Sequence, residues 1–142
     1  MMALNMPDLQ AGRTPMSEAV THSIRVEVMS RYSVENSRPL EDTWVFEYTV
    51  RITNQGPDTV QLLNRHWIIT DGLDHVNEVK GPGVVGEQPV LEPGESFKYS
   101  SWCPLHTPFG SMRGTYEMTG PGGKKFDIEI APFALKAPYT VN

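Results

Sequence analysis

Apolar and polar side chains alternate along several segments of this chain. Ile24, Val26 and Val28 share one parity, and charged residues stand between them. Residues 43–54 repeat the pattern with five large side chains on one face: Trp44, Phe46, Tyr48, Val50 and Ile52. A helix would scatter these side chains around its circumference, whereas a strand lines them up on one side. The pattern therefore predicts two β-strands, each with one buried face.

Further short strands are predicted after these two, separated by turns rich in Gly and Pro. They cover 60–70, 76–80, 97–102, 112–118 and 126–130, with an edge segment at 89–91 and room for another after 131. In the first of them Trp67 and Ile69 take the opposite parity from Val60, which indicates a β-bulge or a change of sheet near Asn64. The segment 104–108 is expected to be a loop, and the last two strands a hairpin.

The spacing of these elements predicts one all-β domain. Turns recur every ~8 to 12 residues and no stretch keeps helical spacing, which is typical of a β-sandwich of about seven to eight antiparallel strands. A chain of 142 residues fits one hydrophobic core. Residues 1–21 lack periodicity and are expected to be a flexible tail. The domain is then expected over 22–136, with a C-terminal extension at 137–142.

Composition narrows the classes of partner. The net charge is -5 and the basic residues are scattered, so we expect no nucleic-acid binding. The single cysteine, Cys103, cannot form an internal disulfide. No apolar run approaches the ~18 residues that cross a bilayer, and the first residues do not resemble a secretion signal. We expect a cytoplasmic protein without a membrane span.

One glycine run invites a nucleotide-binding interpretation. Gly81, Gly83 and Gly86 match G-x-G-x-x-G letter for letter. That motif binds pyrophosphate when a helix N-terminus follows it, but here Pro89 follows within three residues, and His106 stands where an acidic ribose ligand would be expected. We expect a strand-to-strand loop and not a Rossmann site. The backbone N–H groups of such a loop could still form an anion-binding nest.

Three groups of polar residues offer candidate sites. His66 is expected to be a hydrogen-bonded structural histidine. The cluster Asp71, Asp74 and His75 offers oxygen and nitrogen ligands, but its spacing matches no calcium loop.

The pair Cys103 and His106 has C-x-x-H spacing, yet a zinc site needs four ligands and a catalytic thiol needs a positioned base. We therefore predict no catalytic residue, no metal site and no cofactor, and we expect Cys103 to be packed.

The segment 107–114 is the candidate interaction loop. It contains Phe109, Met112 and Arg113 together with two glycines, Gly110 and Gly114. Exposed Phe, Met and Arg side chains are favoured at protein interfaces. The other interpretation is a plain loop that enters a strand, with Gly114 making room for a neighbouring ring.

Four blocks together resemble one known family. They read LLNRHWIITDG from Leu62, GVVGEQPVLEPGESFKY from Gly83, CPLHTPFGSMRGTYEM from Cys103 and FDIEIAPFAL from Phe126. In this order and spacing they are similar to the ApaG family, over about residues 23–135. The resemblance implies a fibronectin type III-like, immunoglobulin-like β-sandwich. It also implies a genetic link to cobalt resistance and magnesium efflux, but no catalytic residue set.

These observations lead to a functional expectation. We expect a non-enzymatic ApaG-domain protein that interacts with or regulates a partner protein in divalent-cation homeostasis. The alternative is a binder of a phosphate-bearing or metal-complexed compound at the Gly81 to Gly86 loop. An unpaired edge strand leaves a homodimer open.

Overall fold

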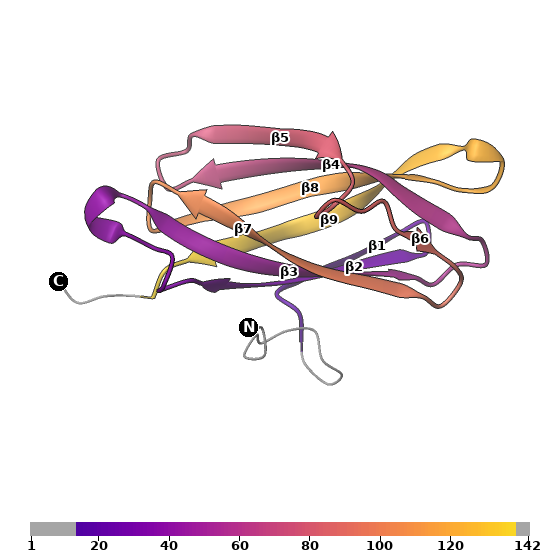
Figure 1. The fold of residues 1–142 in the computed structure, drawn as a ribbon, viewed down its shortest axis with the longest axis horizontal. Coiled ribbons are helices and arrows are strands. Elements are labelled where there is room, and N and C mark those ends of the chain that lie inside the picture. The colour runs from indigo at the N-terminus through magenta and orange to yellow at the C-terminus, as the bar shows by residue number, and fades with distance from the viewer. Residues whose placement is uncertain (1–13, 139–142) are drawn as a thin grey trace.

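The computed structural model describes residues 14–138, which form nine strands in two antiparallel sheets (Figure 1). Two short 3-10 turns, η2 (Pro39–Glu41) and η3 (Pro121–Gly123), lie in connections. The strands are β1 (Ser17–Thr21), β2 (Ile24–Tyr32), β3 (Trp44–Asn54), β4 (Val60–Asp71), β5 (Val76–Pro82), β6 (Val90–Leu91), β7 (Ser96–Leu105), β8 (Phe109–Thr119) and β9 (Lys125–Lys136). The predicted all-β sandwich is confirmed.

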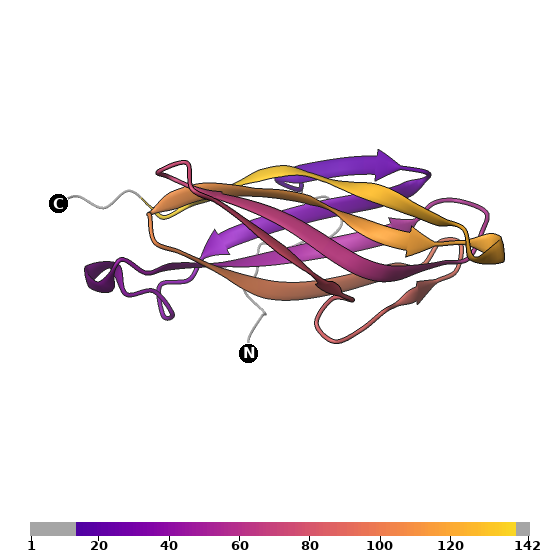
Figure 2. The ribbon, with the colours of Figure 1, turned by 90° about the horizontal axis from the view of Figure 1, so that it is seen from above.

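The two sheets stack face to face, as Figure 2 shows from above. One sheet has the order β1-β2-β3-β7, and the other has the order β5-β4-β8-β9, with β6 pairing to β4. The predicted face of β3 is buried between them, since Phe46, Val50 and Ile52 are fully enclosed. They meet Tyr116 and Ile128 of the other sheet in one hydrophobic core.

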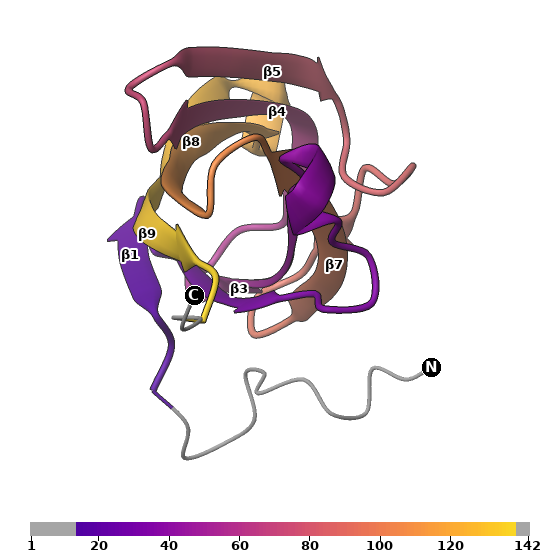
Figure 3. The ribbon, with the colours of Figure 1, turned by 90° about the vertical axis from the view of Figure 1, so that its left-hand side faces the viewer.

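The two long sides of the sandwich differ (Figure 3). On one side β1 and β2 lie against β9, and the side chain of Ser30 donates a hydrogen bond to the carbonyl oxygen of Ala134. On the other side β5 and β7 are the last strands of their sheets, and within residues 14–138 no strand pairs with their outer edges. Pro82 in β5 and Pro104 in β7 lie on these open edges, where a missing N–H is tolerated.

The structure corrects three predictions. The expected tail is wrong for Ser17–Thr21, which pairs with β2 as strand β1; residues 1–13 lie outside the described part. The expected loop at 104–108 begins later, because β7 continues through Leu105 and buries it. The strand after Ala131 is the continuation of β9, which stays paired with β8 beyond a β-bulge in which Ala131 and Pro132 of β9 lie opposite Arg113. Among residues 14–138 the structure has no helix with the length and apolar character needed to span a bilayer.

Candidate functional site

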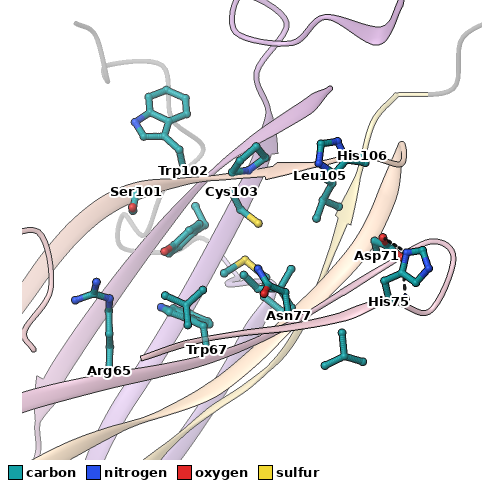
Figure 4. Close-up of a pocket in the computed structure, with 16 residues that line it drawn as sticks. Arg65, Trp67, Asp71, His75, Asn77, Ser101, Trp102, Cys103, Leu105 and His106 are labelled. Atoms are coloured by element: carbon teal, nitrogen blue, oxygen red, sulfur yellow. Dashed lines mark hydrogen bonds and ion pairs between the residues drawn. The ribbon is translucent and has the colours of Figure 1, made fainter. Parts of the chain in front are cut away.

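A cleft lies on the open side of the sandwich, between β4 and β5 of one sheet and β7 of the other (Figure 4). Its main cavity has a volume of about 610 Å³. A second cavity of about 230 Å³ adjoins it towards the glycine segment, and both are lined by Tyr48, Arg65 and Ser101. We call the two cavities together the edge cleft. Its size is in the range of small-molecule and side-chain binding pockets.

Strand parity explains which side chains line the edge cleft. A register shift between Leu62 and Asn64 puts Arg65 and Trp67 on the inner face of β4, which confirms the bulge predicted there. On β7, simple alternation turns Cys103 inward. Figure 4 shows the Cys103 sulfur directed into the cavity, whereas the ring of Trp102 points away from it at the rim.

Among residues 14–138, Arg65 is the one side chain with a permanent positive charge that lines the edge cleft. Its Nη1 donates hydrogen bonds to the carbonyl oxygens of Pro82 and Gly83 at 2.8 and 2.9 Å. The guanidinium lies against Gly81, where an added Cβ would come within 2.9 Å of Nη2. The turn after β5 therefore holds the guanidinium in one place.

Buried hydroxyl groups surround this charge. The hydroxyl groups of Tyr99 and Tyr116 are 2.5 Å apart, and Tyr48 is hydrogen-bonded to Ser101. Desolvation raises the pKa of Tyr48, Tyr99 and Tyr116 above the ordinary tyrosine value. All three remain neutral around pH ~7, so they contribute hydrogen-bonding groups without adding charge.

Cys103 and His106 differ in burial. Both line the edge cleft, but His106 is exposed and its Nδ1 lies 3.2 Å from the carbonyl oxygen of Asp42. Burial raises the pKa of the Cys103 thiol to about 12. The side chain is packed in the core, as predicted.

We expect Cys103 to resist alkylation by iodoacetamide at about pH 8 in the folded protein. The raised pKa leaves little thiolate, and the burial of the side chain limits access. Mass spectrometry should show modification at least about a hundredfold slower than in the urea-unfolded chain. Equal rates in the two states would contradict this expectation.

Asp71 and His75 close the far end of the edge cleft. Asp71 accepts backbone hydrogen bonds from Leu73 and His75, and its Oδ2 lies 3.2 Å from His75 Nδ1. Desolvation acts to raise the pKa of Asp71, but these hydrogen bonds and the imidazole outweigh it, so the net pKa lies below the ordinary value. Within residues 14–138, no group of three or more His, Cys, Asp or Glu side chains is arranged to hold a metal ion. Asp74 therefore joins no such group with Asp71 and His75.

The glycine segment makes a tight turn. Val84 and Glu87 exchange both backbone hydrogen bonds, and Val85 and Gly86 between them have φ values of 42° and 80°. Positive φ at both central positions is the geometry of a type I′ turn. Gly83 has φ 64°, and a Cβ there would lie 2.4 Å from a backbone oxygen, so glycine is required. Strand β6 follows, not a helix.

The buried side of this turn belongs to the core. Val84 is enclosed, so the segment from Gly81 to Gly86 is anchored by an apolar side chain. The N–H groups of Gly83 and Val84 donate to backbone carbonyls. An anion-binding nest would have to use the remaining amides of this turn, and it stays a prediction.

The predicted interaction loop is a strand. Residues 109–119 form β8, paired with β4 and β9. Met112 is buried, so it does not share an exposed surface with Phe109 and Arg113, and the interaction role of the segment stays a prediction. Phe109 and Arg113 are exposed, and the Phe109 ring covers Gly72. Strand alternation separates Met112 from the other two.

His66 matches its predicted structural role. It lies on the outer face of β4 and its Nε2 is 2.8 Å from Glu78 Oε1 of β5. This hydrogen bond lowers the pKa of Glu78. The pair ties the edge strand to the sheet.

The sequence patterns did not single out Arg65, Trp67 and Trp102 as residues of a site. The parity slip near Asn64 indicated that Arg65 faces the interior, because a slip of one residue changes which alternate side chains of the strand point inward. Nothing in the sequence indicated that β7 would be the strand on the other side.

Comparison with known proteins identifies the family. The ApaG domain pattern matches residues 34–120. Protein ApaG of Bordetella pertussis is 52% identical over 121 residues, which cover 85% of this chain and 92% of that protein. Protein ApaG of Anaeromyxobacter sp. (strain K) is 54% identical over 127 residues, covering 89% of this chain and all of that protein.

A solved structure agrees with this result. A crystal structure of a Bordetella pertussis protein superposes with a TM-score of 0.79 at 50% identity, covering 89% of this chain and 98% of that one. The matches in sequence and in structure span the strands that build the edge cleft. This chain belongs to the ApaG domain family.

Proposed function

We propose that this protein is a non-enzymatic interaction module that receives part of a partner protein in the edge cleft. The observation that carries the proposal is the cleft itself, about 610 Å³ in its main cavity, on the long side of the sandwich where, within residues 14–138, the end strands β5 and β7 do not lie against each other as β1 and β9 do. Rigid sheets form its walls, and such walls suit recognition of a pre-shaped group.

The rim of the edge cleft is apolar and exposed. Val76, Val85 and Trp102 line its cavities, and 62%, 55% and 49% of their surfaces are exposed. An exposed tryptophan beside a pocket is the side chain most often found at the energetic centre of protein interfaces. The rim therefore supports binding of a partner's apolar side chain.

The open edges favour side-chain insertion over strand addition. Pro82 and Pro104 interrupt the rows of N–H groups on β5 and β7. A partner strand would lose hydrogen bonds at both places. The family resemblance implies a link to cobalt and magnesium homeostasis. We propose that the partner protein acts in that process.

A phosphate-bearing ligand at the Gly81 to Gly86 loop has less support. Two amides of that segment, those of Gly83 and Val84, are occupied by backbone bonds, and the side chain of Val84 is buried. The edge cleft offers more volume and a fixed charge.

Trp102→Asp should weaken partner binding about tenfold or more, because it places a charge where the rim is apolar. The measurement is quantitative affinity capture from lysate of the source cells, followed by titration of the recovered partner against the purified variant. Val20→Asp is the matched control, since Val20 is similarly exposed, at 50%, but lies on β1 at the closed side. A partner that binds wild type and Trp102→Asp equally would refute this proposal.

A further inference from the structure

Arg65 is a cation without a carboxylate partner. It is half-buried on the inner face of β4, and within residues 14–138 no carboxylate oxygen lies within 4.0 Å of its guanidinium. Its guanidinium donates hydrogen bonds to two carbonyl oxygens, which carry only partial charge. A partly desolvated charge is stabilised when a counter-ion approaches it. The position therefore favours an anion.

The guanidinium is held in place before any ligand arrives. Pro82 and Gly83 hold Nη1, and the backbone of Gly81 lies close to Nη2. Figure 4 shows Arg65 extending from β4 across the cleft towards Ser101 of β7. A planar fork that is fixed in this way loses little entropy when it binds a planar, two-oxygen anion.

The charges that line the edge cleft match a ligand with a single negative charge. In the part of the chain that the structure describes, Arg65 provides the one permanent positive charge of the lining, and the one carboxylate, Asp71, lies at the far end and is hydrogen-bonded to His75. A phosphate dianion would need further donors, yet the nearby amides of Gly83 and Val84 already donate to carbonyls. A carboxylate is the anion that one guanidinium satisfies.

One wall of the cavity is apolar. Trp67 lines it beside Arg65, two residues further along β4, and Leu105 and Met112 line it further towards Asp71; all three are at most 4% exposed. Trp67 is held by edge-to-face contacts with the rings of Tyr48 and Tyr116. This wall can hold an alkyl or aryl arm that begins at the carboxylate.

We propose that the edge cleft binds a monocarboxylate with an apolar arm, the carboxylate on Arg65 and the arm against Trp67, Leu105 and Met112. This inference rests on the proposed function, because it names the chemistry recognised by the same cleft. The carboxylate can come from a free organic acid or from the C-terminal residue of a partner chain, since both present the same two oxygens next to an apolar group.

Titration of the full-length protein followed by two-dimensional NMR tests this proposal. The probes are octanoate and the peptide acetyl-Ala-Ala-Leu, each compared with its neutral counterpart, octanamide or the C-terminal amide of the peptide. At least one acid should shift the Arg65 and Trp67 side-chain signals and bind about tenfold or more tightly than its amide. Binding by octanoate alone indicates a free acid, and binding by the peptide alone indicates a chain terminus.

Arg65→Gln should remove the preference for acid over amide, while Arg113→Gln should keep it. Arg113 is exposed on β8 and lines neither cavity, so it controls for a general loss of positive charge. The dispersion of the NMR spectrum shows whether each variant is folded, and the acid and amide comparison on wild type needs no variant. Equal binding of acid and amide, no binding of either acid, or an unchanged preference in folded Arg65→Gln would overturn the inference. If binding of a partner depends on Trp102 but not on Arg65, the proposed function is supported although this inference fails.

Discussion

Alkaline pH is expected to destabilise this protein steeply. Tyr48, Tyr99, Tyr116 and Cys103 are buried, and desolvation raises the pKa of each side chain above its ordinary value. Those ordinary values are 10.0 for tyrosine and 9.0 for the thiol. The unfolded chain therefore releases these protons at a lower pH than the folded chain does. As the pH rises, the free energy of unfolding must fall.

The pH window follows from these directions. Below about pH 9 all four groups are protonated in both states, and their contribution to stability is fully present. From about pH 9 only the unfolded chain ionises Cys103, and from about pH 10 it also ionises the three tyrosines. Each group that is protonated only in the folded state lowers the free energy of unfolding by about 1.4 kcal/mol per pH unit. Above pH 10 these groups act together, so the free energy of unfolding falls more steeply with pH than any one of them alone would cause.

Urea denaturation followed by circular dichroism, repeated from about pH 8 to about pH 11, measures this slope. The matched variant is the double substitution Tyr99→Phe and Tyr116→Phe, which removes both hydroxyl groups of the 2.5 Å pair and leaves neither without its partner. Its slope above pH 10 should be about half that of wild type. A free energy of unfolding that stays constant to pH 11, or an unchanged slope in the double variant, would show that these tyrosines ionise in the folded state.

Gly114→Ala is expected to destabilise the protein by about 3 kcal/mol or more. Gly114 pairs with Trp67 of β4 and lies next to the place where β9 bulges opposite β8. A Cβ at this position would lie 2.1 Å from the carbonyl oxygen of His66 and 3.2 Å from the Cα of Trp67. Both are backbone atoms, so no side-chain rotation relieves the clash. β4 and β8 would have to separate and weaken the hydrogen bonds between them.

Gly120→Ala provides the control for this substitution. An added Cβ at Gly120 would have the Phe126 ring 3.5 Å away as its nearest neighbour, which is ordinary van der Waals contact. We expect its free energy of unfolding to stay within about 0.5 kcal/mol of wild type. Both variants are compared by urea denaturation at one pH. If Gly114→Ala is as stable as Gly120→Ala, the backbones of β4 and β8 do not approach each other at Gly114 as closely as described.

Local patterns predicted most strands because burial of a strand face leaves a period of two in the sequence. The face of β3 and the bulge of β4 near Asn64 both followed from that period alone. Ser17–Thr21 escaped prediction because it buries little, with Ser17 as its one enclosed residue, and its order comes from pairing with β2 and contact with β9. Met112 was misplaced because glycines and a proline around it resemble a loop, whereas pairing on both sides makes the segment a strand.

The sequence by itself determined the fold class, the buried face of each long strand and the family. It did so because alternation and block order are local properties of the chain. Only the tertiary structure decided the site, because Arg65 and Ser101 are far apart in the sequence and meet across two sheets. Which strand edges stay unpaired depends on the order of strands in both sheets, and that order leaves β5 and β7 facing the same opening. Strand parity turns the Arg65 side chain towards the interior of the sandwich, and the packing of the two sheets forms the cleft around it.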